Sequence, residues 1–245
     1  MTGSSQPLKN IPARERLIFA LDVSDRAQAL AWIDHIGDSA AFYKIGLELL
    51  AGGDYFAVLD ELAQRDKKIF VDLKLHDVPA TVAGAVRGLA RWPVAFCTVH
   101  CDSRAMLEAA AAAKANDLRL LAVTVLTSND QADLAALGVT DELADVVVER
   151  ARLAQAAGID GVVCSGADLP RLRAALGPDL LTVCPGIRPS GPAGDDQKRI
   201  VDVHSAFTDG ADYIVVGRPI RQAADPRAMA ETMVAQISDT LASLS

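Results

Sequence analysis

Eight short β-rich runs recur along the 245-residue chain, and amphipathic segments rich in Ala and Leu lie between them. We expect strands over 17–23, 42–46, 68–75, 95–100, 118–126, 161–165, 180–184 and 212–217. Helical spacing is clearest over 26–36, 48–65, 103–115, 142–157 and 225–241. Strict alternation favours parallel strands joined by helical crossovers, and eight such units in about 250 residues typify a closed barrel. We predict an α/β fold, a single (β/α)8 TIM barrel over 1–245, with 1–15 as a loose leader.

An open, doubly wound sheet is the competing architecture. Its dinucleotide-binding form carries a Gly-rich turn after the first strand, whereas this chain has Leu21-Asp22-Val23-Ser24-Asp25 there. No linker rich in Gly, Pro or Ser divides the chain. We therefore favour the barrel, whose chemistry collects at the C-terminal ends of the strands.

The overall charge and the apolar pattern restrict the partners of the chain. The 24 Lys and Arg against 32 Asp and Glu give a net charge of −8 without a long run of one sign, which argues against nucleic-acid binding. Apolar stretches are shorter than the roughly 20 residues that span a bilayer. The cysteines form no CxxC pair, and buried free thiols suit a reducing cytoplasm. They are Cys97, Cys101, Cys164 and Cys184. We expect a soluble cytoplasmic protein with no nucleic-acid or membrane partner.

The third expected strand carries charge in an apolar run. Asp72 and Lys74 share one face of this strand, and Asp77 follows on the loop. Taken alone, the pair could equally be a partly buried ion pair that fixes the strand register. Lys44 and Asp22 occupy corresponding places near the ends of strands two and one. Such a row is costly to bury for packing alone, and its alternating signs keep each lysine protonated, as a general acid requires.

A second group of candidates follows strands seven and eight. The segments Pro185-Gly186-Ile187-Arg188 and Val216-Gly217-Arg218 combine glycine with a guanidinium group. In (β/α)8 enzymes these two loops commonly bind phosphate. The alternative is that the glycines only form turns and the arginines are solvated.

Other polar residues give weaker signals. Thr127 ends strand five and could hydrogen-bond a substrate, although such residues often satisfy local backbone groups. His100 ends strand four and is more often a hydrogen-bonded histidine than a ligand. We expect His35 and His204 at the surface and assign His76 no chemistry.

These segments together resemble the orotidine 5'-phosphate decarboxylase family of the bacterial type. The resemblance rests on Asp72-Leu73-Lys74-Leu75-His76-Asp77-Val78-Pro79, on Lys44 upstream, and on the two downstream loops with Asp195-Asp196-Gln197 between them. The Asp-x-Lys-x-x-Asp core alone is shared with related phosphosugar enzymes. Its occurrence together with both phosphate loops is much more specific, and the match spans most of the chain.

The resemblance implies decarboxylation of orotidine 5'-phosphate to uridine 5'-phosphate in pyrimidine biosynthesis, by a homodimer with shared active sites and neither cofactor nor metal. The implied catalytic residues are Lys74 as proton donor, Asp72 beside the leaving carboxylate, Lys44, and Asp77 reaching the partner subunit's site. The implied substrate-binding residues are Asp22, Lys44, Val78, Thr81, Thr127, Arg188, Gln197, Gly217 and Arg218. Residues 190–194 would form the lid.

The chain departs from the family pattern at two places. Val78 replaces a common isoleucine, and Cys101-Asp102-Ser103-Arg104 replaces a small, Gly-containing stretch. Two other functions stay open from the residues. One is a Mg-dependent phosphosugar decarboxylase or aldolase of the same superfamily, and the other is a non-catalytic barrel that binds a phosphate ligand.

Overall fold

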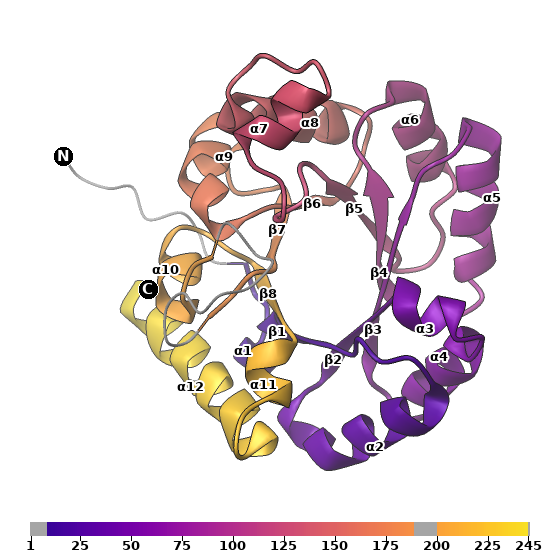
Figure 1. The fold of residues 1–245 in the computed structure, drawn as a ribbon, viewed down its shortest axis with the longest axis vertical. Helices are drawn as coiled ribbons and strands as arrows, with labels where there is room; N and C mark the ends of the chain where they lie inside the picture. The colour runs from indigo at the N-terminus through magenta and orange to yellow at the C-terminus, as the bar shows by residue number, and fades with distance from the viewer. Residues whose placement is uncertain (1–8, 189–199, 245) are drawn as a thin grey trace.

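The computed structural model describes residues 9–188 and 200–244, and these form a closed barrel of parallel strands in the order β1 to β8 (Figure 1). The strands are β1 (Leu17–Ala20), β2 (Phe42–Gly46), β3 (Lys68–Leu75), β4 (Val94–His100), β5 (Arg119–Val123), β6 (Gly161–Val163), β7 (Leu181–Cys184) and β8 (Tyr213–Val216). The predicted (β/α)8 barrel is confirmed. Several strands end one to three residues earlier than expected, where the chain turns toward the rim.

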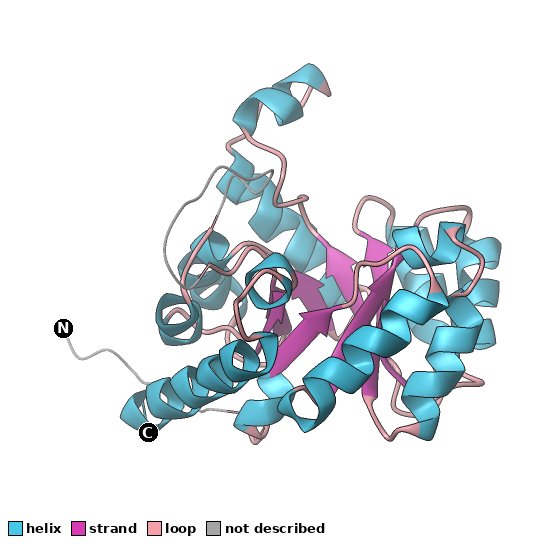
Figure 2. Cartoon of the chain, turned by 60° about the horizontal axis from the view of Figure 1, so that its bottom comes forward, coloured by secondary structure: helices cyan, strands magenta, loops and turns pink. Residues whose placement is uncertain are grey.

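Helices surround the strands on the outside of the barrel (Figure 2). They are α1 (Ala13–Arg16), α2 (Arg26–Ile36), α3 (Leu47–Ala51), α4 (Tyr55–Gln64), α5 (Pro79–Leu89), α6 (Arg104–Ala112), α7 (Gln131–Ala136), α8 (Leu143–Ala156), α9 (Leu169–Leu176), α10 (Val203–Thr208), α11 (Arg218–Arg221) and α12 (Pro226–Leu244), with 3-10 turns η1 (Gly37–Ser39) and η2 (Gly166–Asp168).

The continuous helix expected over 48–65 is wrong, because the chain breaks between α3 and α4. Gly53 has φ +91°, in the left-handed region that favours glycine. A Cβ atom at Gly52 would lie 1.9 Å from the carbonyl oxygen of Ser24. The break therefore lets the β2 loop approach the β1 loop closely, and both loops belong to the same rim.

Apolar residues pack in two layers, one inside the barrel and one between strands and helices. The inner layer consists of Ile18, Ala20, Phe42, Phe70, Phe96, Leu121, Leu181, Val183, Tyr213 and Val215. The rings of Phe42 and Phe96 lie 5.1 Å apart, and the Tyr213 ring lies 5.0 Å from Phe96. Along β3, Phe70 points inward and Val71 outward, as the period of two requires. The aromatic layer fills the barrel interior and leaves its C-terminal rim for polar groups.

The expected loose leader is wrong for residues 9–15, while residues 1–8 lie outside the described part. Lys9 Nζ lies 2.7 Å from Asp212 Oδ2, and α1 follows directly. Arg16 is 2% exposed, and its guanidinium donates to the carbonyls of Lys9, Ile11 and Asp212. The segment stays in place because its cations pair with acceptors at the N-terminal end of the barrel.

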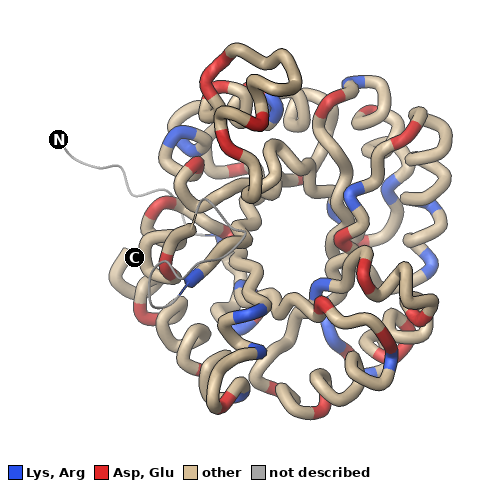
Figure 3. Tube along the Cα trace, in the orientation of Figure 1, with Lys and Arg blue, Asp and Glu red and all other residues tan. Residues whose placement is uncertain are grey.

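Charges of both signs are spread around the outer ring of helices (Figure 3). All four cysteines are buried and free, as predicted. Among the described helices, none combines the length and the apolar character needed to cross a bilayer.

Candidate active site

A cavity of about 290 Å³ opens at the C-terminal ends of the strands, where the barrel fold concentrates functional residues. Eight predicted site residues line it: Asp22, Lys44, Asp72, Lys74, Thr127, Arg188, Gly217 and Arg218. The remaining lining residues are Ala20, Phe70, Val123, Val125, Leu126, Ser128, Val163, Pro185, Gly186, Val215 and Arg221. Residues from the ends of β1, β2, β3, β5, β7 and β8 therefore meet in one space, as the sequence predicted.

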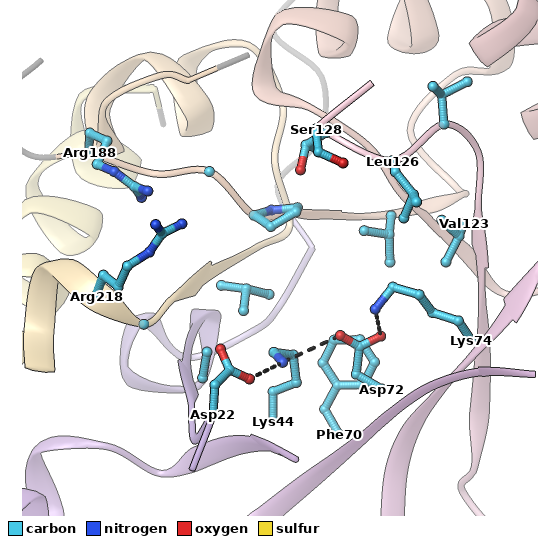
Figure 4. Close-up of a pocket in the computed structure, with 18 of the residues that line it drawn as sticks. Asp22, Lys44, Phe70, Asp72, Lys74, Val123, Leu126, Ser128, Arg188 and Arg218 are labelled. Atoms are coloured by element: carbon cyan, nitrogen blue, oxygen red, sulfur yellow. Dashed lines mark hydrogen bonds and ion pairs between the residues drawn. The ribbon is translucent and has the colours of Figure 1, made fainter. Parts of the chain in front are cut away.

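The charged side chains from β1 to β3 form a continuous row along one side of the cavity (Figure 4). Lys44 Nζ lies 2.7 Å from Asp22 Oδ1 and 3.4 Å from Asp72 Oδ2. Lys74 Nζ lies 2.9 Å from Asp72 Oδ1. We call Asp22, Lys44, Asp72 and Lys74 the ionic row. Its signs alternate, so each ammonium has a carboxylate neighbour and Asp72 has two ammonium neighbours.

Burial and charge act in opposite directions on the middle of the ionic row. Burial alone would lower the pKa of Lys44, but the carboxylates of Asp72 and Asp22 outweigh it and raise that pKa. Burial alone would raise the pKa of Asp72, but the ammonium groups of Lys44 and Lys74 outweigh it and lower that pKa. Lys44 and Asp72 are therefore both ionised at neutral pH, although their side chains are only 12% and 13% exposed.

Lys74 reaches the row through an irregular backbone. The pairing of β3 with β4 shifts between Val71, opposite Cys97, and Leu75, opposite Val99. Lys74 has φ +50°, which a non-glycine residue rarely adopts. Asp72 and Lys74 meet as predicted, but through a bulge and not through the regular alternation assumed from the sequence.

Two arginines face the ionic row across the cavity. In Figure 4 the guanidinium groups of Arg188 and Arg218 point toward each other, on the side away from Lys74. Gly186, two residues before Arg188, has φ +79°, and a Cβ atom at Gly217 would lie 3.2 Å from Ala20 Cβ. Both loops are thus shaped by glycine to bring cations toward one space, which suits an anion.

Sequence reasoning missed a third arginine of this cavity. The Arg221 guanidinium donates to the backbone carbonyl of Asp22, and its Nε atom is buried. Arg221 follows Arg218 by three residues on α11, and this spacing could have indicated a shared helix face.

The apolar wall was also missed as part of a site. The apolar lining residues are Val123 at the end of β5, Val125 and Leu126 just after it, Val163 on β6 and Val215 on β8. Inward apolar residues at strand ends have the same sequence pattern as core residues. They give the cavity apolar lining in addition to the ionic row.

Three other predicted site residues within the described ranges do not line this cavity. Asp77, Val78 and Thr81 are exposed on the loop after β3 and the start of α5, and Val78 is 62% exposed. The Asp77 carboxylate accepts a hydrogen bond from the backbone N–H of Val78, at 2.6 Å. Gln197 and the expected lid over 190–194 lie outside the described residues.

The unusual loop after β4 has a defined structure. Cys101 is buried and donates to the Arg150 carbonyl, while Ser103 caps α6 by accepting from Met106 N–H. Asp102 Oδ2 lies 3.0 Å from His76 Nε2. The rings of His76 and His100 are 5.2 Å apart, and burial followed by this neighbour lowers the pKa of His100. His76, to which the sequence assigned no chemistry, thus connects the β3 and β4 loops.

Metal ligands are not grouped in the part of the chain that the structure describes. No cluster of three or more His, Cys, Asp or Glu residues there could hold a metal ion. In the ionic row, Lys44 lies between the carboxylates of Asp22 and Asp72.

A comparison with models of protein families shows which family the chain belongs to. Residues 15–233 match the orotidine 5'-phosphate decarboxylase / HUMPS family. The chain belongs to this family. This confirms the resemblance inferred from Asp72 to Pro79 and the two phosphate loops.

Relatives in the orotidine 5'-phosphate decarboxylase / HUMPS family resemble the chain over nearly its whole length. A protein named orotidine 5'-phosphate decarboxylase from Stenotrophomonas maltophilia is 62% identical, over 99% of both chains. One of that name from Xanthomonas euvesicatoria is 62% identical over 94% of this chain and 95% of the relative. The crystal structure of orotidine 5'-phosphate decarboxylase from Lactobacillus acidophilus has a TM-score of 0.80 at 34% identity, covering 91% of this chain and 99% of that one.

Proposed function

We propose that the chain is a carbon–carbon lyase that decarboxylates orotidine 5'-phosphate to uridine 5'-phosphate in pyrimidine biosynthesis, without a cofactor. The observation that carries the proposal is the Lys74 ammonium, held 2.9 Å from Asp72 in a cavity that is also lined by Arg188, Arg218 and Arg221. The family and the names of close relatives support the same reaction.

The chemistry requires a cation beside the pyrimidine ring. When the bond between C6 and the carboxylate breaks, CO₂ leaves and the electron pair stays on C6, in the plane of the ring. The ring π system cannot delocalise that pair, so a nearby charge must stabilise it. Lys74 stabilises the pair electrostatically and then transfers a proton from Nζ to C6, and it recovers a proton from solvent.

Asp72 and Lys44 support the proton donor. Asp72 keeps the Lys74 ammonium aligned, and Lys44 balances the second oxygen of Asp72. Asp72 also crowds the substrate carboxylate, so that a like-charge contact is relieved as CO₂ departs.

The nucleotide fits the cavity in one direction. Arg188, Arg218 and Gly217 hold the phosphate on one side, because guanidinium groups form paired hydrogen bonds to phosphate oxygens. Gln197, which is outside the described residues, is a further phosphate ligand that the family resemblance implies. Asp22 and Lys44 contact the ribose hydroxyls, and Thr127 lines the nucleotide site. Arg188 and Arg218 lie on the side of the cavity away from Lys74 (Figure 4), and this arrangement suits a substrate with its phosphate remote from the reacting carbon.

A homodimer with shared active sites accounts for the exposed residues after β3. Asp77, Val78 and Thr81 reach the partner subunit's cavity, where Asp77 extends the ionic row. A mixture of Lys74→Ala and Asp77→Ala chains tests this, because a mixed dimer carries one site with both residues intact. Dissociation and reassociation of the mixture should restore activity, and an inactive mixed dimer would contradict shared sites. The buried free thiols support a location in the cytoplasm.

The loss of orotidine 5'-phosphate absorbance tests the reaction, and the assay is run with and without EDTA. We expect turnover that the chelator does not change. Turnover abolished by EDTA and restored by Mg²⁺ would favour the metal-dependent phosphosugar chemistry. Binding of uridine 5'-phosphate without any turnover would favour a non-catalytic ligand-binding barrel.

A further inference from the structure

Thr98 is a buried polar residue on the inner face of β4, between Phe96 and His100, and its side chain contacts two members of the ionic row. We propose that Thr98 is a positioning residue of the reaction, which orients the Asp72 carboxylate and holds the backbone of Lys74. The proposal deepens the proposed decarboxylase function and rests on it. Thr98 does not line the cavity and is 0% exposed, so it acts through its neighbours.

The hydrogen bonds of Thr98 have a fixed direction. Lys74 N–H lies 2.9 Å from Thr98 Oγ1, and this backbone group can only donate. The hydroxyl therefore accepts from Lys74 and gives its single proton to Asp72 Oδ1, also at 2.9 Å. One hydroxyl thus connects the backbone of the proton donor to the carboxylate beside it.

The bulge in β3 explains why Lys74 needs this partner. Between the pairs Val71 with Cys97 and Leu75 with Val99, β3 has three residues where β4 has one, and that one is Thr98. The Lys74 amide leaves the regular ladder there, and the Thr98 side chain accepts it instead. The φ of +50° at Lys74 is energetically costly for a non-glycine residue, so it persists only where surrounding contacts hold the backbone in place.

The same contact restricts the Asp72 carboxylate. Oδ1 accepts from both Lys74 Nζ and Thr98, while Oδ2 faces Lys44. The carboxylate cannot rotate without breaking one of these contacts. Lys74 is consequently fixed relative to Asp72 at its backbone and at its ammonium group, which is the alignment that proton delivery to C6 requires.

Thr98→Val tests the proposal, because valine keeps the shape of threonine and removes both hydrogen bonds. We expect kcat to fall about 10- to 100-fold, as for a small misplacement of a reacting group, while KM changes less than about threefold. The acid limb of the kcat profile should move to higher pH, since Asp72 loses a hydrogen bond that favours its charged form. Thr98→Ser, which keeps the hydroxyl, should retain the wild-type profile.

Thr182→Val is the matched control. Thr182 is 1% exposed and lies at the opposite end of the barrel. Its hydroxyl donates to the Gly210 carbonyl and accepts from Asp212 N–H and from the Arg173 guanidinium. Thr182→Val should lower thermal stability and leave kcat unchanged. If Thr98→Val behaves in the same way, the positioning role is wrong. If Thr98→Val does not fold, Thr98→Cys replaces it, because a thiol bonds only weakly.

Crystal structures of Thr98→Val and the wild type separate this proposal from the reaction itself. An inactive wild type would refute the decarboxylase function. The positioning role makes a separate structural prediction, which can be checked even if the wild type is inactive. In the Thr98→Val structure, either Lys74 should leave its left-handed φ or its ammonium should move away from Asp72. Unchanged geometry at both places would overturn it.

Discussion

Asp72→Asn removes the charge at the centre of the ionic row while keeping the shape of the side chain. The carboxylate lies 2.9 Å from Lys74 Nζ and 3.4 Å from Lys44 Nζ, and its side chain is 13% exposed. With an effective dielectric constant of about 20, each attraction is worth about 5 kcal/mol before solvation. The asparagine leaves two ammonium groups facing an uncharged amide.

The net change in stability is smaller than these attractions, because the variant no longer desolvates a carboxylate. Breaking a buried charge pair from one side costs about 3–5 kcal/mol, and Asp22 still balances Lys44 here. We therefore expect the free energy of unfolding to fall by about 3 kcal/mol. For a domain of this size the melting temperature should fall by about 6–12 °C.

The difference between wild type and Asp72→Asn should depend on pH in one direction. The pKa of Asp72 is lowered in the folded state, so its stabilisation is complete above its unfolded pKa of about 4 and is lost as the pH falls through the folded pKa. Thermal unfolding followed by circular dichroism from pH 7 to pH 3 measures this. The two melting curves should converge at the acid end.

Asp38→Asn is the control for this comparison. Asp38 is 98% exposed beside Lys67, and its loss should change stability by less than about 1 kcal/mol. The electrostatic reasoning fails if Asp72→Asn is as stable as wild type at pH 7, or if the gap widens in acid. The same variant should lose at least about 100-fold in kcat, and an unchanged kcat would refute the role of Asp72 in the reaction.

Three further variants separate chemistry, substrate capture and folding. Lys74→Ala should abolish turnover and leave uridine 5'-phosphate binding, measured by calorimetry, largely intact; substantial residual decarboxylation would count against Lys74 as the acid. Arg218→Ala should mainly lower kcat/KM by raising KM, and an unchanged kcat/KM would refute the phosphate assignment. Asp212→Asn at the N-terminal end should cost about 3 kcal/mol or more, because Lys9 and Arg173 lose a carboxylate at 2.7 and 2.9 Å. Its KM should stay unchanged, and a raised KM would show that the two barrel ends are coupled.

The barrel and the ionic row could be predicted because both follow from local regularities. Apolar runs broken by a charge near the strand end, as at Lys44 and Asp72, give both the strand and the direction of the side chain. Parallel neighbours then bring such strand ends to the same rim, so distant residues such as Asp22 and Arg218 could be assigned to one cavity.

Features set by long-range contacts could not be predicted. The left-handed φ of Lys74 and the role of Thr98 depend on a register shift between β3 and β4. Such a shift does not change the alternation of apolar and polar residues in the sequence of either strand. The cations of Lys9 and Arg16 resembled those of a solvated leader, because their acceptors near residue 212 are remote in sequence. The Asp102 contact with His76 likewise joins two separate loops.

The aromatic layer under the ionic row determines how substrate and product can enter and leave the cavity. Phe42, Phe70, Phe96 and Tyr213 pack against one another inside the barrel, below Lys44 and Asp72. Within residues 9–188 and 200–244, the cavity thus has a hydrocarbon floor. In the proposed reaction the CO₂ released beside Asp72 therefore leaves through the opening at the C-terminal rim of the barrel, which is also the entrance for the nucleotide. A bulkier group at Leu126, on the cavity wall and 38% exposed, would obstruct entry and escape together.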